Sequence, residues 1–268
     1  MKRIISFICI FLIGHMLYSQ VLIALLLGDK LNTGKIEFGL DGGVSYSYIG
    51  NMDANRWDRN WNLGFYFDIR MKNQWYLSTG VLVKSTLGID ELTEKDLEFL
   101  EATTYDYDGK YSQKISYFIV PALAKYKFDN HLYAEIGPQF GLMHKANIEF
   151  DSDVDGIDIN GKEDNKDQIK RIDMGLTAGV GYRLLKGLGW TIGLRYYYGF
   201  IDVYKDRSGT KNKALFLRVN VPIGLSQEKK DEIKNMKETK KEKKKNQKEA
   251  KKEEKEKEKE KEKENSSK

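Results

Sequence analysis

The sequence IDMGLTAGVGYRLLKGLGWTIGLRYYYGF, residues 172–200, decides the fold because its bulky apolar side chains recur at every second position. They alternate with Asp, Gly, Thr and Arg from Ile172 to Leu184 and again from Trp190 to Phe200, and Lys186-Gly187 interrupts the pattern. A period of two is typical of β-strands, whereas a helix needs apolar positions three or four apart. The stretch therefore predicts a hairpin, and each strand has roughly the 9–11 residues that cross a membrane when tilted.

The same alternation predicts six further strands, which makes eight in all. One of them is irregular near Pro121, where we expect a bulge or an edge-like irregularity. Short connections alternate regularly with long ones, as in outer-membrane barrels with short periplasmic turns and longer outer loops, and a soluble sandwich has no need of this order. The six strands are expected at 36–48, 61–71, 75–85, 115–128, 132–144 and 215–225. The long connections are 49–60, 86–114, 147–171 and 204–212, and the short ones lie at 72–74, 129–130 and 186–187.

Charged side chains of the expected strands fall on the face opposite to the bulky apolar one. In a sandwich this face would meet solvent, whereas in an eight-stranded barrel it would fill a narrow polar interior and leave no open pore. The apolar face is nearly free of charge in seven of the strands, which favours an all-β, antiparallel, up-and-down transmembrane barrel. The residues expected to pair in its interior are Glu37, Asp68, Arg70, Glu135, Asp173, Arg183, Arg195 and Arg218.

The N-terminus predicts export. Lys2 and Arg3 precede an apolar run that ends in polar residues, so residues 1–20 are typical of a secretory signal peptide. A second apolar run follows, and the alternative is a retained anchor over residues 4–27. The only cysteine, Cys9, lies in this segment, so the remaining chain has no disulfide or thiolate metal site. The expected organisation is a signal at 1–20, a short apolar segment at 21–34, the barrel at 35–225 and a low-complexity tail at 226–268.

The basic balance of the chain lies entirely in its tail. Residues 227–268 hold 18 Lys against 13 Asp or Glu, which accounts for the whole formal charge of +5. The body has no net charge to attract nucleic acid. With no apolar face to pack, the tail is predicted to be solvated and largely disordered, with helix restricted to its first part.

Two groups of residues suggest chemistry. The acidic run with Asp151, Asp153, Asp155 and Asp158 resembles the start of a calcium loop, although Lys162 stands where a glutamate is expected, and the alternative is a solvated acidic loop. The only histidines outside the signal are His131 and His144. A lipid-modifying barrel would need one of them beside a nucleophile. Serine and threonine are common enough that one can lie nearby by chance, so the histidines alone do not indicate an enzyme. We expect no catalytic residues and no cofactor.

Two segments resemble the PorT-type outer-membrane β-barrel family of Bacteroidota, which is similar to small OmpX-like and OmpA-like barrels. They are VLIALLLGDKL at 21–31 followed by GKIEFG at 34–39, and EIGPQ at 135–139. The resemblance covers residues 21–225 and implies an outer-membrane protein with periplasmic termini and tail and extracellular long loops. One departure is that Leu225 precedes a long tail, whereas many such barrels end on an aromatic residue.

The family has no agreed catalytic motif, so the resemblance implies a non-enzymatic structural or interaction role in the cell envelope. One such role is linked to the secretion of surface proteins. The implied partners are outer-membrane lipid and lipopolysaccharide, and envelope or secretion-system proteins. The alternatives are a barrel that binds or transports a small ligand and, third, a lipid-modifying enzyme.

Overall fold

The computed structural model describes residues 35–154, 157–184 and 189–223. The predicted signal, the apolar segment up to residue 34 and the charged tail lie outside these ranges. The elements are β1 (Ile36–Ile49), β2 (Arg56–Lys72), β3 (Trp75–Lys84), β4 (Thr86–Asp90), α2 (Glu94–Phe99), β5 (Lys110–Lys127), β6 (Leu132–Val154), β7 (Ile157–Asp164), the 3-10 helix η1 (Lys166–Gln168), β8 (Ile172–Arg183), β9 (Thr191–Asp202) and β10 (Lys211–Pro222). Among the residues described, no helix combines the length and apolar character needed to cross a membrane.

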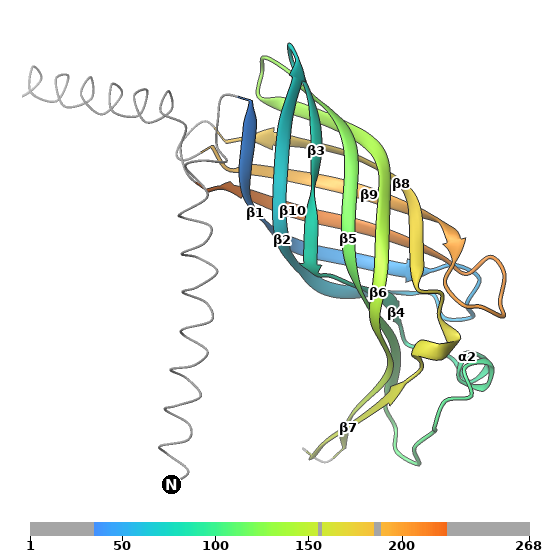
Figure 1. The fold of residues 1–268 in the computed structure, drawn as a ribbon. Helices are drawn as coiled ribbons and strands as arrows, with labels where there is room; N and C mark the ends of the chain where they lie inside the picture. The colour runs from blue at the N-terminus through green and yellow to red at the C-terminus, as the bar shows by residue number, and fades with distance from the viewer. Residues whose placement is uncertain (1–34, 155–156, 185–188, 224–268) are drawn as a thin grey trace, which may run out of the picture. The chain divides into compact units, whose positions relative to one another are not determined.

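Eight of the strands close into a ring (Figure 1). The order is β1–β2–β3–β5–β6–β8–β9–β10, and β10 pairs with β1 from Gly39↔Pro222 to Ile49↔Asn212. Every neighbouring pair is antiparallel. The eight-stranded antiparallel barrel predicted from alternation is confirmed, and closure removes the free edges that an open sheet would expose.

Four strands run at least four residues beyond their predicted ends. β2 begins at Arg56, β5 begins at Lys110, β10 begins at Lys211 and β6 continues to Val154. The predicted connections 49–60, 86–114 and 147–171 therefore contain the extended strand ends, β4, α2 and β7. Outside a membrane both faces of a strand can be polar, so the alternation that marks a spanning strand is lost there.

The predicted bulge at Pro121 is wrong. Pro121 pairs in register with Gln139, and the irregularity of β5 lies instead between Ser116 and Tyr117. The apolar pattern is lost near Pro121 because the inward side chains of β5, such as Ile119 and Leu123, are also apolar. The backbone there remains regular although the sequence alternation does not.

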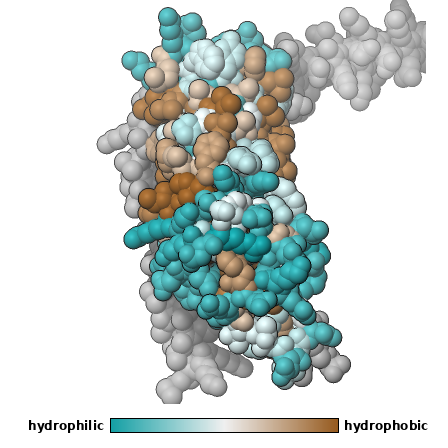
Figure 2. Space-filling view, turned by 90° about the vertical axis from the view of Figure 1, so that its right-hand side faces the viewer, coloured by the Kyte–Doolittle hydropathy of each residue, from teal (hydrophilic) through white to brown (hydrophobic). Residues whose placement is uncertain are grey.

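The outer surface has two zones (Figure 2). Around the ring, large apolar side chains point outward, and Trp61, Ile136 and Phe200 each leave more than half of their surface exposed. Beyond this apolar band, where β4, β7 and α2 lie in Figure 1, the visible face is mostly hydrophilic. A continuous apolar band of this kind is what a transmembrane barrel presents to lipid.

An apolar cluster fills the barrel under the long connections. It includes Leu87 and Ile89 of β4, Leu97 of α2, Ile115 of β5 and Ile148 of β6, all buried. The helix α2 begins with a capping box between Thr93 and Asp96, the arrangement that satisfies free N–H groups at a helix start.

The buried carboxylate of Asp96 joins three connections. It accepts hydrogen bonds from the backbone N–H groups of Asp53 (2.9 Å) and Ala54 (2.8 Å) and lies 3.6 Å from Arg207 Nη1. In addition, Gln168 Nε2 donates to the carbonyl of Leu100 at 2.8 Å. The connections therefore form one packed cap over the end of the barrel.

Closure of the ring depends on glycine where β1 meets β10. A Cβ added at Gly43 would lie 2.0 Å from the carbonyl oxygen of Leu217, whereas a Cβ at the adjacent Gly42 would meet nothing closer than 3.8 Å. We expect Gly43→Val to prevent closure and Gly42→Val to be tolerated. The measurement is heat-modifiable migration of the refolded protein in detergent gels: the first variant loses the folded band and the second keeps it. Equal folding of both variants would contradict the β1–β10 register.

Candidate functional site: the charged interior and the outer sheet

The centre of the charged interior is Glu135 on β6. It accepts a hydrogen bond from Nε of Arg195 on β9. The second carboxylate oxygen lies 3.3 Å from Nζ of Lys125 on β5, and Oε1 lies 3.6 Å from Nη1 of Arg218 on β10. All four side chains are at most 5% exposed. One carboxylate is thus shared by cations from three other strands.

Two aspartates also pair with the cations of this network. Lys125 donates to both carboxylate oxygens of Asp68 on β2, at 3.0 and 3.1 Å, and Lys127 contacts the same carboxylate at 2.8 Å. Arg218 forms a bidentate pair with Asp41 on β1, with its Nε at 3.0 Å from Oδ1. Buried ions are stable only when paired in this way. The network joins six of the eight ring strands.

A second, smaller group lies toward the short-turn end of the interior. Nη2 of Arg183 on β8 lies 3.0 Å from Oε2 of Glu37 on β1. The hydroxyl of Tyr66 on β2 donates to Oε1 of the same carboxylate at 3.0 Å. The side chains of Arg183 and Glu37 are partly exposed, unlike those around Glu135, whereas Tyr66 is buried. The group therefore lines the mouth of the barrel.

The predicted interior residues do not form one cluster. Asp68, Glu135, Arg195 and Arg218 lie together, and Glu37 lies with Arg183, as described above. Asp173 is buried apart from both groups and accepts a hydrogen bond from Nδ2 of Asn212 at 3.0 Å. Arg70 does not join them: it is exposed and donates from Nε to the carbonyl of Asn73 at 3.1 Å. Its expected pairing fails because it lies at the rim of β2, where a guanidinium can stay in water.

Sequence reasoning missed Lys125. Its ammonium group lies 4.5 Å from the centre of the Tyr133 ring. The ring in turn fits against glycine: a Cβ at Gly181 or Gly193 would come within 2.4 Å of the Tyr133 phenol group. Glycines on the inner faces of β8 and β9 thus make room for a large side chain from β6. The signal that could have marked this site is a pair of lysines, Lys125 and Lys127, on one face at the end of a mostly apolar stretch of β5.

The predicted calcium loop crosses the β6–β7 turn. Asp151 and Asp153 lie on β6 and Asp158 on β7, with Asp153 paired to Asp158, while Asp155 lies outside the described residues. Strands flank this segment, whereas helices flank the calcium loop of an EF-hand. Within the described part of the chain, no group of three or more His, Cys, Asp or Glu side chains could hold a metal ion. Calcium binding here stays a prediction.

Each of the two histidines contacts an aromatic ring. The ring of His144 stacks on Phe118 with centroids 4.5 Å apart, and His131 lies edge-on to Tyr182 at 6.4 Å. Among the described residues, no hydrogen bond joins either histidine to a serine or threonine hydroxyl. The geometry thus offers no pair of nucleophile and base in this part of the chain.

Beyond the apolar band, β4, β5, β6 and β7 form an outer sheet (Figure 1). Lys114 on β5 pairs with the buried carboxylate of Asp58 on β2, which ties the base of the sheet to the barrel wall. On β6, Phe150 stacks against Tyr105 at 4.7 Å. Within the described residues β7 pairs only with β6, so its other edge is free of a strand partner. The outer sheet thus extends the barrel wall beyond the apolar band and is tied to it by side-chain contacts.

The interior network predicts a large asymmetry between two charge deletions. Removal of the shared carboxylate by Glu135→Ala leaves buried cations without their partner, and such losses cost about 3–5 kcal/mol. Arg70→Ala removes an exposed charge and is expected to change stability by less than about 0.5 kcal/mol. Urea unfolding in detergent micelles, followed by the heat-modifiable gel shift, measures both. Equal stability of the two variants would show that the network does not hold the barrel together.

Comparison with known proteins agrees with this architecture. Residues 28–205, more than half of the chain, match the family model described as outer membrane protein beta-barrel domain. Solved structures similar to this chain include Ail of Yersinia pestis, at 14% identity over 70% of this chain and 99% of that chain with a TM-score of 0.36. Another is OprG of Pseudomonas aeruginosa, at 13% identity over 70% and 93% with a TM-score of 0.34.

Neisserial surface protein A is also similar, at 14% identity over 69% of this chain and 96% of that chain, with a TM-score of 0.33. No curated protein matches the chain. The family match spans most of the barrel, from ahead of β1 to just past β9. The chain therefore belongs to the outer-membrane β-barrel family and is a protein of the outer membrane.

Proposed function

We propose that the chain is a non-enzymatic outer-membrane protein with a structural or interaction role in the cell envelope. One observation carries the proposal: two clusters of buried side chains occupy the interior, while the chain outside the apolar band folds into further strands and a helix. One cluster is the charged network around Glu135, and the other is the apolar cluster with Leu97 and Ile115. A barrel of this kind works through its surfaces.

The same proposal gives the protein an orientation. Short turns face the periplasm in bacterial outer-membrane barrels and longer connections face outward. We therefore expect the outer sheet and α2 at the cell surface, and the termini with the charged tail in the periplasm. The tail would then be free to touch cell-wall polymer or a periplasmic partner.

Outer-membrane lipid and lipopolysaccharide are the first proposed partners. Several cations lie where the apolar band meets the long connections and have no ion pair among the described residues. One of them, Lys213, lies between the rings of Tyr48 and Tyr198, at 5.9 and 5.7 Å from their centres. Lipid phosphates are the natural counter-charges at this depth. The cations are Arg59, Lys84, Lys145, Arg171 and Lys213.

The finer assignment to a PorT-type protein of Bacteroidota, acting beside surface-protein secretion, is supported by the sequence resemblance at residues 21–39 and 135–139. In that role the partner is a protein of the secretion machinery. A shared envelope complex would use the outer sheet, the tail or both.

A ligand-binding or transport role has less support. A cavity at the short-turn end, lined by Lys127, His131 and Arg183 among others, measures about 130 Å³. Pockets for small molecules usually enclose about 300–1,000 Å³. This interior cavity is smaller than such pockets, which favours the interaction role over binding or transport of a small ligand inside the barrel.

The filled interior predicts a barrel without a pore. We expect the refolded protein to give no steady conductance in planar lipid bilayers, because ions would have to displace the pairs around Glu135 and pass the apolar cap. The control is Glu135→Ala, which removes a side chain from the charged network only. We expect no steady conductance from this variant either, because the apolar cap is unchanged. Steady conductance of the unmodified protein would contradict the proposal.

Partner recovery tests the interaction role. Three forms are extracted in mild detergent and purified by affinity: the intact chain, a chain ending at Leu225, and a chain in which Asn-Gly replaces residues 150–161. Because Glu149 pairs with Lys162, a two-residue turn can close the shortened hairpin. We expect a defined envelope protein with the intact chain and its loss from the form that lacks its contact surface. Equal recovery from all forms, or a purified chain that is alone and hydrolyses lipid, would overturn the proposal.

A further inference from the structure

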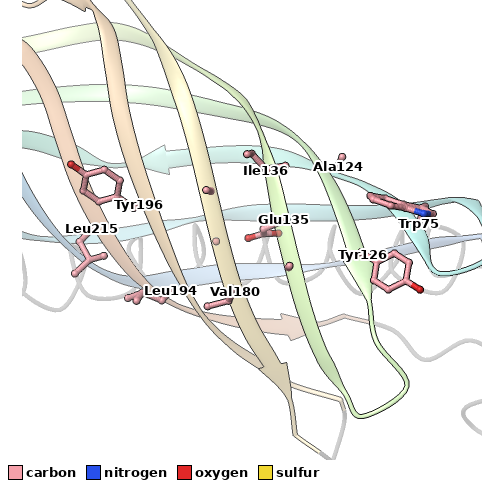
Figure 3. A pocket seen from close by; sticks show the side chains of 12 residues that line it. Trp75, Ala124, Tyr126, Glu135, Ile136, Val180, Leu194, Tyr196 and Leu215 are labelled. Carbon is pink, nitrogen blue, oxygen red and sulfur yellow. The ribbon is translucent and has the colours of Figure 1, made fainter.

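An apolar groove of about 450 Å³ lies on the lipid-facing wall of the barrel (Figure 3). Its floor is formed where Ala124 of β5, Ala134 of β6 and Ala178 of β8 follow one another across three strands. Larger side chains stand at both ends, with Trp75 and Tyr126 at one and Tyr196 and Leu215 at the other. The groove is thus a local depression within the apolar band.

The groove faces hydrocarbon. Glu135 also contributes to its lining, but the carboxylate of this residue is engaged by Arg195 and Lys125 on the interior side. The remaining lining is apolar or presents an aromatic ring. Inside a bilayer a groove with no occupant loses dispersion contacts, because no atoms face its lining.

A cation lies beyond the aromatic end of the groove. Lys72 of β2 is the register partner of Trp75, which in turn pairs with Tyr126, and this pair stacks edge-on at 5.0 Å. Lys72 is exposed and forms no ion pair among the described residues. Tryptophan and tyrosine favour the membrane interface. Lys72, the aromatic pair of Trp75 and Tyr126, and the apolar groove therefore follow one another along the wall of the barrel.

We propose that the groove binds one acyl chain of a glycerophospholipid whose phosphate lies against Lys72. The order of charge, aromatic belt and apolar groove matches the order of phosphate, glycerol region and acyl chain in such a lipid. A symmetric contact with a second copy of the chain would pair the same patch with itself and bring Lys72 toward another cation. This site is separate from the proposed interaction surface and does not depend on it.

The test uses refolded full-length protein, stripped of lipid in detergent and titrated with dioleoyl-phosphatidylglycerol. Native mass spectrometry counts the bound lipids and the copies of the chain. The variant Ala134→Phe/Ala178→Phe fills the groove, and Ala122→Phe makes the same change on β5 at a position outside its lining. Lys72→Gln removes the cation, and Lys166→Gln removes an exposed charge far from the groove. Heat-modifiable migration first establishes that each variant is folded.

We expect one retained phospholipid in the unmodified protein and in both control variants, and none in the filled variant. Lys72→Gln should weaken binding about tenfold, as expected for one charge-assisted hydrogen bond. If the filled variant does not fold, the comparison of Lys72→Gln with Lys166→Gln decides alone. Retention by the filled variant, equal weakening in both lysine variants, or a lipid-free dimer would overturn the proposal.

Discussion

The pairing of β1 with β10 is the constraint on which the rest of the structure depends. Within hydrocarbon no water is available to satisfy backbone N–H and C=O groups, so a sheet can cross a membrane only if its first and last strands meet. The register from Gly39↔Pro222 to Ile49↔Asn212 achieves this over eleven residues of each strand. It also brings Asp41 opposite the region of Arg218, so the seam of the barrel is joined by side chains as well as by backbone.

Closure in turn fixes how the interior is used. Eight strands enclose a space just wide enough for side chains, and every inward residue must fit the others. The volume is shared unequally: β8 and β9 contribute glycine where β6 contributes Tyr133, and the charged side chains come from strands on both sides. Glu135 stands at the middle of this arrangement, with a carboxylate that meets cations from three strands. The sizes of the inward side chains and their charges thus favour the same order of strands in the ring.

Much of this could be predicted from alternation alone. The pattern over residues 172–200 predicts both β8 and β9 to within two residues, because one face of each strand meets lipid and the other does not. The same alternation placed Glu135 and Arg195 on the inner face of the barrel, although it could not predict which charges would pair. Lys125 was missed because the residues before it on its own face, Ile119 and Leu123, are as apolar as those on the outer face, which hides its direction.

The outer sheet escaped prediction for a different reason. Above the band, strands such as β7 meet water on both faces, and nothing in Ile157–Asp164 marks an inside and an outside. Arg70 shows the same limit at the other end of the barrel, where the interior opens to solvent. The alternation of apolar and polar residues is thus informative only where the two faces of a strand meet different surroundings.

The buried carboxylate of Asp96 has a consequence for how this surface can vary. Because it accepts hydrogen bonds from Asp53 and Ala54 and from the backbone N–H of Thr93 at the start of α2, and lies near Arg207, these parts of the chain take one position together. A molecule that binds this face would contact segments that are distant in the sequence, and a linear peptide from one of them would reproduce the face poorly. Replacement of one connection by that of a related barrel would disturb the others. We therefore expect the sequences of these connections to change together.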